Sequence, residues 1–195
     1  MTPTNSAHPS RQLRLRSGLA TWITLTVLTA CGNVPPAPTD HFYRLQAAAT
    51  PAPPSPLPAV GTLRADSLYA ERPIIYTDAA EPRLLRQYHY HLWLYPPAAL
   101  VGEHMATSLG TVQDDKAARR IEGRIIAFEQ RRDAQGSRAV AALELRLIDA
   151  GRRGPARTFQ AERAAADTSL PAFVAAMEGA LGDIYLRAIR DLPPP

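Results

Sequence analysis

The clearest pattern in the chain is an alternation of apolar and polar residues over Arg138–Asp149, which predicts a β-strand. Every second residue from position 139 to position 147 is apolar, while Glu144 and Arg146 fall on the opposite side. Because alternate side chains of a strand point to opposite faces, this pattern is typical of an antiparallel sheet with one face toward water. Apolar segments bounded by turn residues predict neighbouring strands over 120–129 and 157–161.

A second alternating segment, Leu84–Tyr95, is rich in aromatic residues and predicts another strand. Its residues are expected to divide between two faces. One face would carry Tyr88, Tyr90, Leu92 and Leu94, and the other His89, His91, Trp93 and Tyr95. Shorter strands are predicted over 41–45, 60–68 and 73–77.

Two segments have the apolar spacing of amphipathic helices. Pro96-Pro97 ends the aromatic strand, and apolar residues then recur with helical spacing up to Gly110. The second helix can be capped by Thr168 or Ser169, with Pro171 in its first turn. Its apolar stripe comprises Phe173, Val174, Met177, Leu181, Ile184, Ala188 and Ile189.

The order of these elements predicts the fold class. Strands come first, followed by a helix, three further strands and a final helix. This order favours an α+β fold, in which an antiparallel sheet has two helices packed on one face. We expect all of these elements to form a single domain over residues 40–192.

The N-terminal segment changes the meaning of the net charge. The 195-residue chain has a formal charge of +4, but residues 1–30 contain three arginines and no acidic residue. The remaining residues carry 19 basic and 18 acidic side chains and are therefore close to neutral. Because a nearly neutral chain gives a weak electrostatic footprint for a polyanion, no nucleic-acid partner is expected.

Residues 1–30 have the organisation of a lipoprotein signal peptide. A polar, arginine-containing segment precedes the apolar stretch Gly18–Thr29, which is too short to span a bilayer. The stretch leads into Leu28-Thr29-Ala30-Cys31, which matches the bacterial lipobox, and Cys31 is the only cysteine. We expect cleavage before Cys31 and an anchor of covalent acyl chains on it. The alternatives are an ordinary secretory signal followed by an incidental cysteine, or a buried free thiol.

The residues that follow Cys31 indicate how the domain would be held. Residues 31–39 are rich in proline and predict an extended tether between the acyl chains and the domain. Gly32 stands where an aspartate would favour retention at the inner membrane. The expected localisation is therefore the periplasmic face of the outer membrane, with the inner membrane less favoured.

Candidate reactive groups are few. His89 and His91 would point the same way on a strand and could bind a metal with His104, but no Asp, Glu or Cys flanks them at ligand spacing. Glu129 is interpreted as a solvated charge at a strand end. The chain has neither a Gly-x-Ser-x-Gly nucleophile motif nor a glycine-rich phosphate loop. We therefore expect no catalysis, no metal and no cofactor other than the covalent acyl chains.

The aromatic strand supplies the candidate partner interface. Its members are Tyr88, Tyr90, Trp93 and Tyr95. Tyrosine and tryptophan are enriched in protein interfaces because they combine a large apolar area with a polar group. The alternative is that these side chains complete the core of the domain.

An ordered series of short motifs resembles the ABC-type transport auxiliary lipoproteins, the family that contains the PqiC-type lipoproteins. The series follows Cys31 and extends over nearly all of residues 40–192. It consists of Phe42-Tyr43-Arg44-Leu45, Arg72-Pro73-Ile74-Ile75-Tyr76, Tyr88 leading to Leu92-Trp93, Pro96-Pro97 before a helix, and Ile126-Ala127-Phe128-Glu129 before the last strands and helix.

The resemblance implies a non-catalytic accessory subunit of an ABC transport system that moves lipids across the envelope. Such a lipoprotein would dock an assembly of MCE-domain proteins at the outer membrane, as a possible ring of identical copies. The alternative is a membrane-tethered carrier of a lipid or another small apolar ligand. A carrier would need an apolar cavity beneath the helices.

Overall fold

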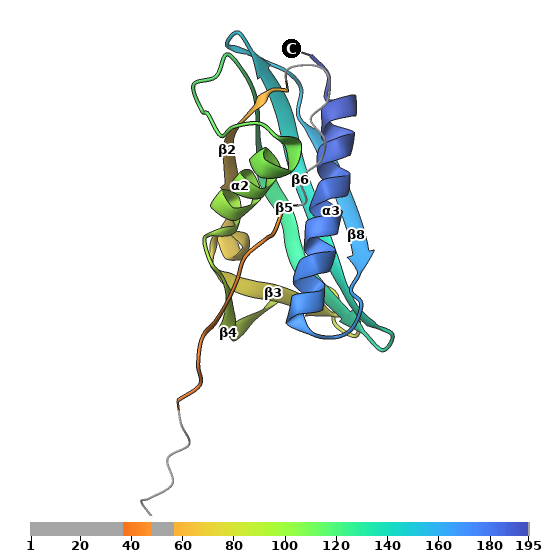
Figure 1. The fold of residues 1–195 in the computed structure, drawn as a ribbon. Coiled ribbons are helices and arrows are strands. Elements are labelled where there is room, and N and C mark those ends of the chain that lie inside the picture. The colour runs from red at the N-terminus through yellow and green to blue at the C-terminus, as the bar shows by residue number, and fades with distance from the viewer. Residues whose placement is uncertain (1–36, 48–56, 195) are drawn as a thin grey trace, which may run out of the picture. The chain divides into compact units, whose positions relative to one another are not determined.

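The computed structural model describes residues 37–47 and 57–194 (Figure 1). All of its helices and strands lie in the compact unit Thr39–Pro195. The predicted signal peptide 1–30, Cys31 and most of the tether lie outside the described residues. The elements are β1 (His41–Tyr43), β2 (Ala59–Ala65), η2 (Ser67–Ala70), β3 (Pro73–Asp78), β4 (Arg86–Trp93), α2 (Pro97–Leu109), β5 (Arg119–Asp133), β6 (Gly136–Asp149), β7 (Arg152–Arg153), β8 (Arg157–Ala164) and α3 (Leu170–Asp191).

The eight strands form one mixed sheet around the long β5–β6 hairpin. Antiparallel pairs join β6 to β5, β7 and β8, and join β3 to β4. Parallel pairs join β1 to β4, and join both β2 and β3 to β5. The predicted α+β class with two helices is confirmed, and the sheet is mixed where antiparallel pairing throughout was expected.

The length of β5 explains the parallel pairs. Its 15 residues offer more hydrogen-bonding edge than one short strand can use. β2 pairs with residues 120–125 of β5, and β3 pairs with residues 129–132, on the edge that β6 leaves free. A β-bulge between Ile125 and Ala127 separates the two regions. β3 and β4 thereby extend the sheet at one end of the molecule (Figure 1).

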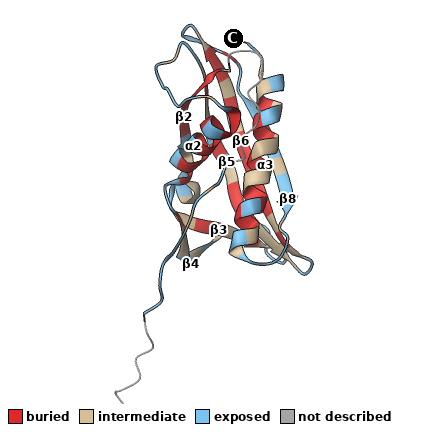
Figure 2. Ribbon diagram, viewed as in Figure 1, coloured by how far each residue is buried: buried red, intermediate tan, exposed pale blue. Residues whose placement is uncertain are grey.

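The hydrophobic core lies between the sheet and the two helices, which cover the same face (Figures 1 and 2). The predicted alternation of β6 is confirmed, since Leu143 and Leu145 are fully buried toward the helices. α3 packs against β6 and β8, and α2 packs against β2. The opposite face of the sheet carries ion pairs, including Arg124 with Glu144 at 3.1 Å and Arg131 with Glu162 at 2.9 Å.

The C-terminus of α2 and the N-terminus of α3 lie where the sequence predicts them. Gly110 adopts a left-handed conformation (φ 66°) and terminates α2, a position that glycine occupies without steric cost. The Ser169 hydroxyl accepts a hydrogen bond from the Ala172 amide at 3.3 Å and caps α3. The predicted apolar stripe of α3 is buried except for Ile189, which is partly exposed. Within residues 37–47 and 57–194, none of the helices is both long and apolar enough to cross a membrane.

The regular alternation predicted for β4 is interrupted. Pro73 of β3 pairs with Leu92, whereas Ile75, only two residues later, pairs with Gln87. The extra residues of β4 bulge out of the ladder and change which side chains share a face. The assignment of alternate residues to two faces over 84–95 is therefore wrong in the middle of this strand.

Candidate docking surface on β1 and β4

Most of the large exposed hydrophobic side chains come from β1, β4 and the segments beside β4. Of the nine such residues in the described chain, six come from β1, β4 and the segments flanking β4. We call these six the β1–β4 surface: Phe42, Leu84, Leu85, Tyr90, Leu94 and Tyr95. Phe42 and Tyr95 are each more than half exposed. Leu84 and Leu85 precede β4 and Leu94 and Tyr95 follow it, so the six residues are spread along the strand. Because exposed apolar side chains mark interaction sites where several occur on neighbouring segments, we take them as the candidate docking site.

A cluster of histidine and tyrosine rings fixes β1 to β4. His41 pairs with His91 in the strand register, and their rings stack with centroids 5.0 Å apart. The Tyr43 hydroxyl lies 3.0 Å from His91 Nδ1, and the Tyr88 ring meets His91 edge-on at 5.6 Å. Burial, followed by the nearby His41, lowers the pKa of His91. The bulge in β4 brings Tyr88 and His91 together although they are three residues apart.

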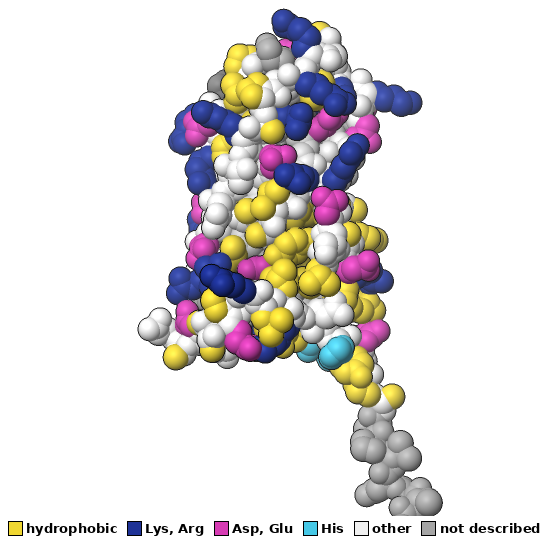
Figure 3. All heavy atoms as spheres, turned by 180° about the vertical axis from the view of Figure 1, so that it is seen from behind, with side chains coloured by type: hydrophobic (Ala, Val, Ile, Leu, Met, Phe, Trp, Pro, Cys, Tyr) yellow, Lys and Arg dark blue, Asp and Glu magenta, His cyan; other side chains and the backbone are white. Residues whose placement is uncertain are grey.

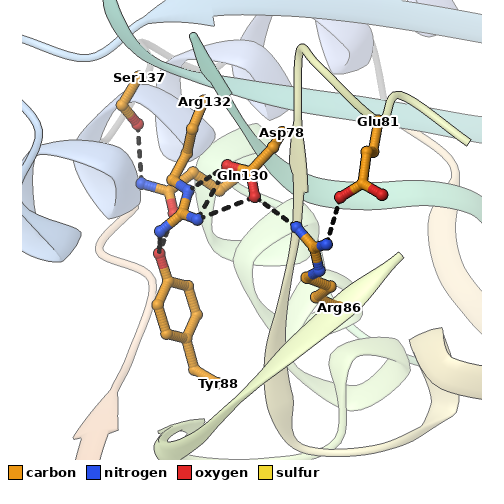
Figure 4. Close-up of polar contacts among 7 residues, drawn as sticks. All are labelled: Asp78, Glu81, Arg86, Tyr88, Gln130, Arg132 and Ser137. Carbon is orange, nitrogen blue, oxygen red and sulfur yellow. Dashed lines mark hydrogen bonds and ion pairs between the residues drawn. The ribbon is translucent and has the colours of Figure 1, made fainter. Parts of the chain in front are cut away.

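Arg132 of β5 holds the neighbouring strands in place (Figure 4). Its guanidinium donates two hydrogen bonds to the Asp78 carboxylate, at 2.9 and 3.1 Å, and lies 4.1 Å from the centre of the Tyr76 ring. Arg86 donates to the same carboxylate at 2.7 Å and also pairs with Glu81. Two-pronged arginine–carboxylate contacts are geometrically specific, so this network fixes the relative positions of β3, β4 and β5.

Tyr88 connects this network to the interior of the sheet (Figure 4). Its hydroxyl donates to Gln130 Oε1 at 2.7 Å and accepts from Arg132 at 3.2 Å. The Gln130 amide donates in turn to the Ser137 hydroxyl at 2.8 Å. Burial raises the pKa of Tyr88, although the positive charge of Arg132 opposes the shift. The polar end of Tyr88 is thus committed to internal hydrogen bonds.

The four predicted interface residues divide into two groups. Trp93 is only 1% exposed and packs against Phe128 and Phe173, with ring centroids 4.9 and 6.1 Å away, so its assignment to the partner interface is wrong. Tyr88 is half-buried in the network described above. Tyr90 and Tyr95 are 44% and 51% exposed and remain available to a partner.

Sequence reasoning missed four members of the β1–β4 surface: Phe42, Leu84, Leu85 and Leu94. The exposure of Phe42 follows from its place in β1, a strand of only three residues at the edge of the sheet. Leu84 and Leu85 precede β4 and were assigned to the strand itself.

The histidines considered as metal ligands do not come together. His104 is buried in α2, where its ring nitrogens lie 3.1 Å from the Tyr185 hydroxyl and 3.3 Å from the Gln46 carbonyl oxygen. His89 is exposed on β4. Among the residues that the structure describes, no three His, Cys, Asp or Glu side chains are grouped so as to hold a metal ion.

Glu129 differs from its interpretation as a solvated charge. It is only 7% exposed, and its carboxylate accepts a short hydrogen bond from the Tyr69 hydroxyl. Burial and this carboxylate together raise the pKa of Tyr69. Glu129 therefore holds the turn of η2 against β5 as a structural residue.

The alternative function, a tethered lipid carrier, would need an apolar cavity beneath the helices. Met105, Met177 and Leu181 are fully buried there, and the core is closely filled. Near the end of α3, a hollow of about 130 Å³ opens beside Ile121 and Leu147. Sites for small organic ligands usually measure roughly 300–1,000 Å³, so this hollow is too small for a lipid. A second hollow of about 420 Å³ beside α2, lined in part by Leu94, Tyr95 and Leu100, falls in that range, and the carrier remains the alternative.

Comparisons with known proteins find relatives by structure only. No family model matches the chain, and no curated protein is significantly similar in sequence. A crystal structure of protein XCC0632 from Xanthomonas campestris, assigned to family DUF330, matches with a TM-score of 0.65 and 19% identity, covering 76% of this chain and 92% of that chain. A second crystal structure, of an uncharacterized protein, matches with a TM-score of 0.63 and 15% identity, covering 79% and 99%. At these identities the similarity shows a shared fold.

Proposed function

We propose that this protein is a lipoprotein on the periplasmic face of the outer membrane. In this proposal it serves as a non-catalytic docking subunit of an MCE-type ABC system that transports lipids across the envelope. The observation that carries the proposal is the concentration of exposed apolar side chains on the β1–β4 surface. The fold shared with a DUF330 protein and the resemblance of the ordered motifs support it.

The position of the β1–β4 surface suits an anchored docking protein. β1 begins at His41, directly after the predicted tether 31–39. The Arg132–Asp78 contacts and the His41–His91 stack hold β1, β3 and β4 rigid, so little side-chain and backbone entropy would be lost when a partner binds. An apolar surface on a strand that follows the proposed anchor and tether in the sequence can receive the end of a transporter assembly.

The anchor is tested by replacing Cys31. The Cys31→Ala variant should leave the membrane fraction and appear in the aqueous periplasmic fraction, because its acyl chains would be missing. If Cys31→Ala still fractionates with the outer membrane, the lipoprotein assignment is wrong. Separation of inner from outer membranes on a density gradient tests the proposed outer-membrane localisation of the unaltered chain.

The docking surface is tested by site-specific photocrosslinking in cells. A photoreactive amino acid at Tyr90 or Tyr95 should capture an MCE-domain protein, whereas the same group at Leu186 should not. Leu186 is a matched control because it is 59% exposed but lies on α3. Capture at Leu186 alone would place the docking surface elsewhere. Failure to recover any envelope transporter subunit from Tyr90 and Tyr95 would reject the proposal.

A ring of identical copies is a separate part of the proposal. Native mass spectrometry of the full chain in detergent should then show one defined oligomer. Tyr95→Ser should reduce transporter capture and leave that oligomer intact, provided the ring uses a different surface. A monomer under all conditions, with capture preserved, would remove the ring from the proposal.

A further inference from the structure

A hollow on the sheet face opposite the helices is rich in arginine and plays no part in the docking proposal. Its volume is about 270 Å³, and its lining comes from four strands. The lining residues are Thr62 and Arg64 of β2, Glu122, Gly123 and Arg124 of β5, Glu144 and Arg146 of β6, and Arg153 of β7. We call this hollow the arginine pocket. Figure 3 shows this face, with lysine and arginine side chains gathered over its upper half.

The charges of the arginine pocket are not balanced from within. It contains four arginines and two glutamates. Glu144 is engaged by Arg124, at 3.1 and 3.4 Å, while Glu122 is engaged at 2.7 Å by Arg120, which lies outside the lining. Within the described residues, the side chains of Arg64, Arg146 and Arg153 form neither an ion pair nor a hydrogen bond.

The strand register places like charges side by side. Arg64 of β2 lies directly opposite Arg124 of β5 in the parallel ladder. Like charges at directly opposed positions of a sheet destabilise it unless they are neutralised. Glu144 neutralises Arg124, whereas Arg64 has no ion pair among the described residues, although Asp66 lies near enough to act on the charge of Arg124. An anion bound in the hollow would supply the missing negative charge.

The backbone at Gly123 contributes to the shape of the pocket. A Cβ atom at this position would overlap the Glu144 carbonyl oxygen, so only glycine lets β5 lie this close to β6. A side chain at this position would point toward Leu145 in the core, so Gly123 contributes only backbone to the pocket. The side chains on either side of it, Glu122 and Arg124, belong to the lining.

We propose that the arginine pocket binds the phosphate group of a small ligand. Guanidinium groups match phosphate oxygens with paired hydrogen bonds, and several arginines converging on one hollow provide more donors than a single surface arginine. With both glutamates engaged, three arginines of the lining remain without an ion pair, enough to neutralise a phosphate monoester, which carries a charge of about −1.5 to −2 at neutral pH. A hollow of about 270 Å³ accommodates one phosphate group with a small organic part.

The test measures binding to the purified full chain in a nonionic detergent, at constant ionic strength. Two probes are titrated separately, inorganic phosphate and the short-chain phospholipid dihexanoyl phosphatidic acid, with binding followed by phosphorus NMR. The variant Arg146→Gln/Arg153→Gln removes two unpaired guanidinium groups. The control Arg44→Gln/Arg83→Gln removes the same charge at two exposed positions outside the pocket.

We expect saturable binding that the pocket variant weakens by about tenfold or more, since two charge-assisted contacts are lost. The control variant should bind as the unaltered chain does. Tighter binding of phosphatidic acid than of phosphate would identify a lipid headgroup as the source of the phosphate, and binding of phosphate alone would identify a water-soluble ligand. Absence of saturable binding by both probes, or equal weakening in the two variants, would overturn the proposal. Thermal unfolding of each variant verifies that it is folded.

Discussion

His104 of α2 and Tyr185 of α3 join the two helices through a hydrogen bond of 3.1 Å between His104 Nδ1 and the tyrosine hydroxyl. Both side chains are buried, and their rings lie 5.6 Å apart. The other ring nitrogen, Nε2, lies 3.3 Å from the Gln46 carbonyl oxygen. Because a carbonyl can only accept, Nε2 carries the hydrogen in the neutral ring, and Nδ1 is an acceptor. The single Tyr185 hydroxyl hydrogen is shared between Nδ1 and the Val101 carbonyl oxygen, which lies 3.3 Å away. Three distant segments thus meet at one histidine.

Replacing Tyr185 by phenylalanine should destabilise the domain by about 1–3 kcal/mol, because His104 Nδ1 would remain buried without a donor. Urea unfolding at neutral pH measures the change. The companion variant His104→Leu/Tyr185→Phe removes both polar groups and should recover part of the loss. If the double variant is less stable than the sum of the single variants predicts, the hydrogen bond does not carry this energy.

The stability of the domain should fall as the pH drops below about 6.5, the ordinary histidine pKa. Burial lowers the pKa of His104 in the folded state, so the unfolded chain binds the proton more readily. The stability that neutral His104 contributes is complete above the unfolded-state pKa and is lost progressively as the pH falls toward the folded-state pKa. His91, whose pKa is also lowered, acts in the same direction.

The contribution of His104 is isolated by comparing unfolding at about pH 8 and about pH 5. The variant His104→Gln should lose less stability between these two pH values than the unaltered chain. His89→Gln is the control, because this histidine is exposed, and it should retain the full pH dependence. Identical pH dependence in all three proteins would contradict the prediction.

Trp93 and Tyr95 should respond in opposite ways to truncation. Trp93→Ala should cost about 3–5 kcal/mol, because it leaves a cavity between Phe128 and Phe173. Tyr95→Ala should change the unfolding free energy by less than about 1 kcal/mol, because its ring is half exposed. Thermal or urea unfolding of the two variants decides the matter. Comparable losses at both positions would mean that Tyr95 also belongs to the core.

Thr77→Val should stabilise the domain by about 1 kcal/mol. Thr77 is 2% exposed, and among the described residues its Oγ1 is a buried side-chain atom without a hydrogen-bond partner. Valine has nearly the same shape and removes the cost of burying that hydroxyl. The midpoint of thermal unfolding should rise. A lower midpoint would show that a bound water or another group satisfies Thr77 Oγ1.

Alanine should have opposite effects at two glycines. Gly123→Ala should destabilise the domain by about 1–3 kcal/mol, because the new Cβ overlaps the Glu144 carbonyl oxygen. Gly182→Ala, in the middle of α3, meets no atom within 4 Å and should stabilise the domain by about 0.5–1 kcal/mol. Urea unfolding of both variants tests the pair. Stabilisation by Gly123→Ala would show that β5 and β6 can separate there.

The candidate docking surface could be predicted from the sequence only in part. The aromatic content of residues 84–95 pointed to the correct strand, and Tyr90 and Tyr95 are exposed as an interface requires. Trp93 could not be assigned correctly, because its burial depends on Phe173, which lies 80 residues further along the chain. The arginine pocket was equally hidden, since its residues come from four separate strands.

By itself, the sequence determined the local elements, because their signals act over a few residues. The alternation of residues 138–149 specifies a strand with one buried face, and Ser169 and Gly110 specify helix ends through their own backbone and side-chain preferences. Only the tertiary structure decided that β2 and β3 pair parallel with β5, and that β4 bulges. Those features depend on which apolar surfaces, distant in the sequence, are buried together. The free energy of that burial is not encoded within any short segment.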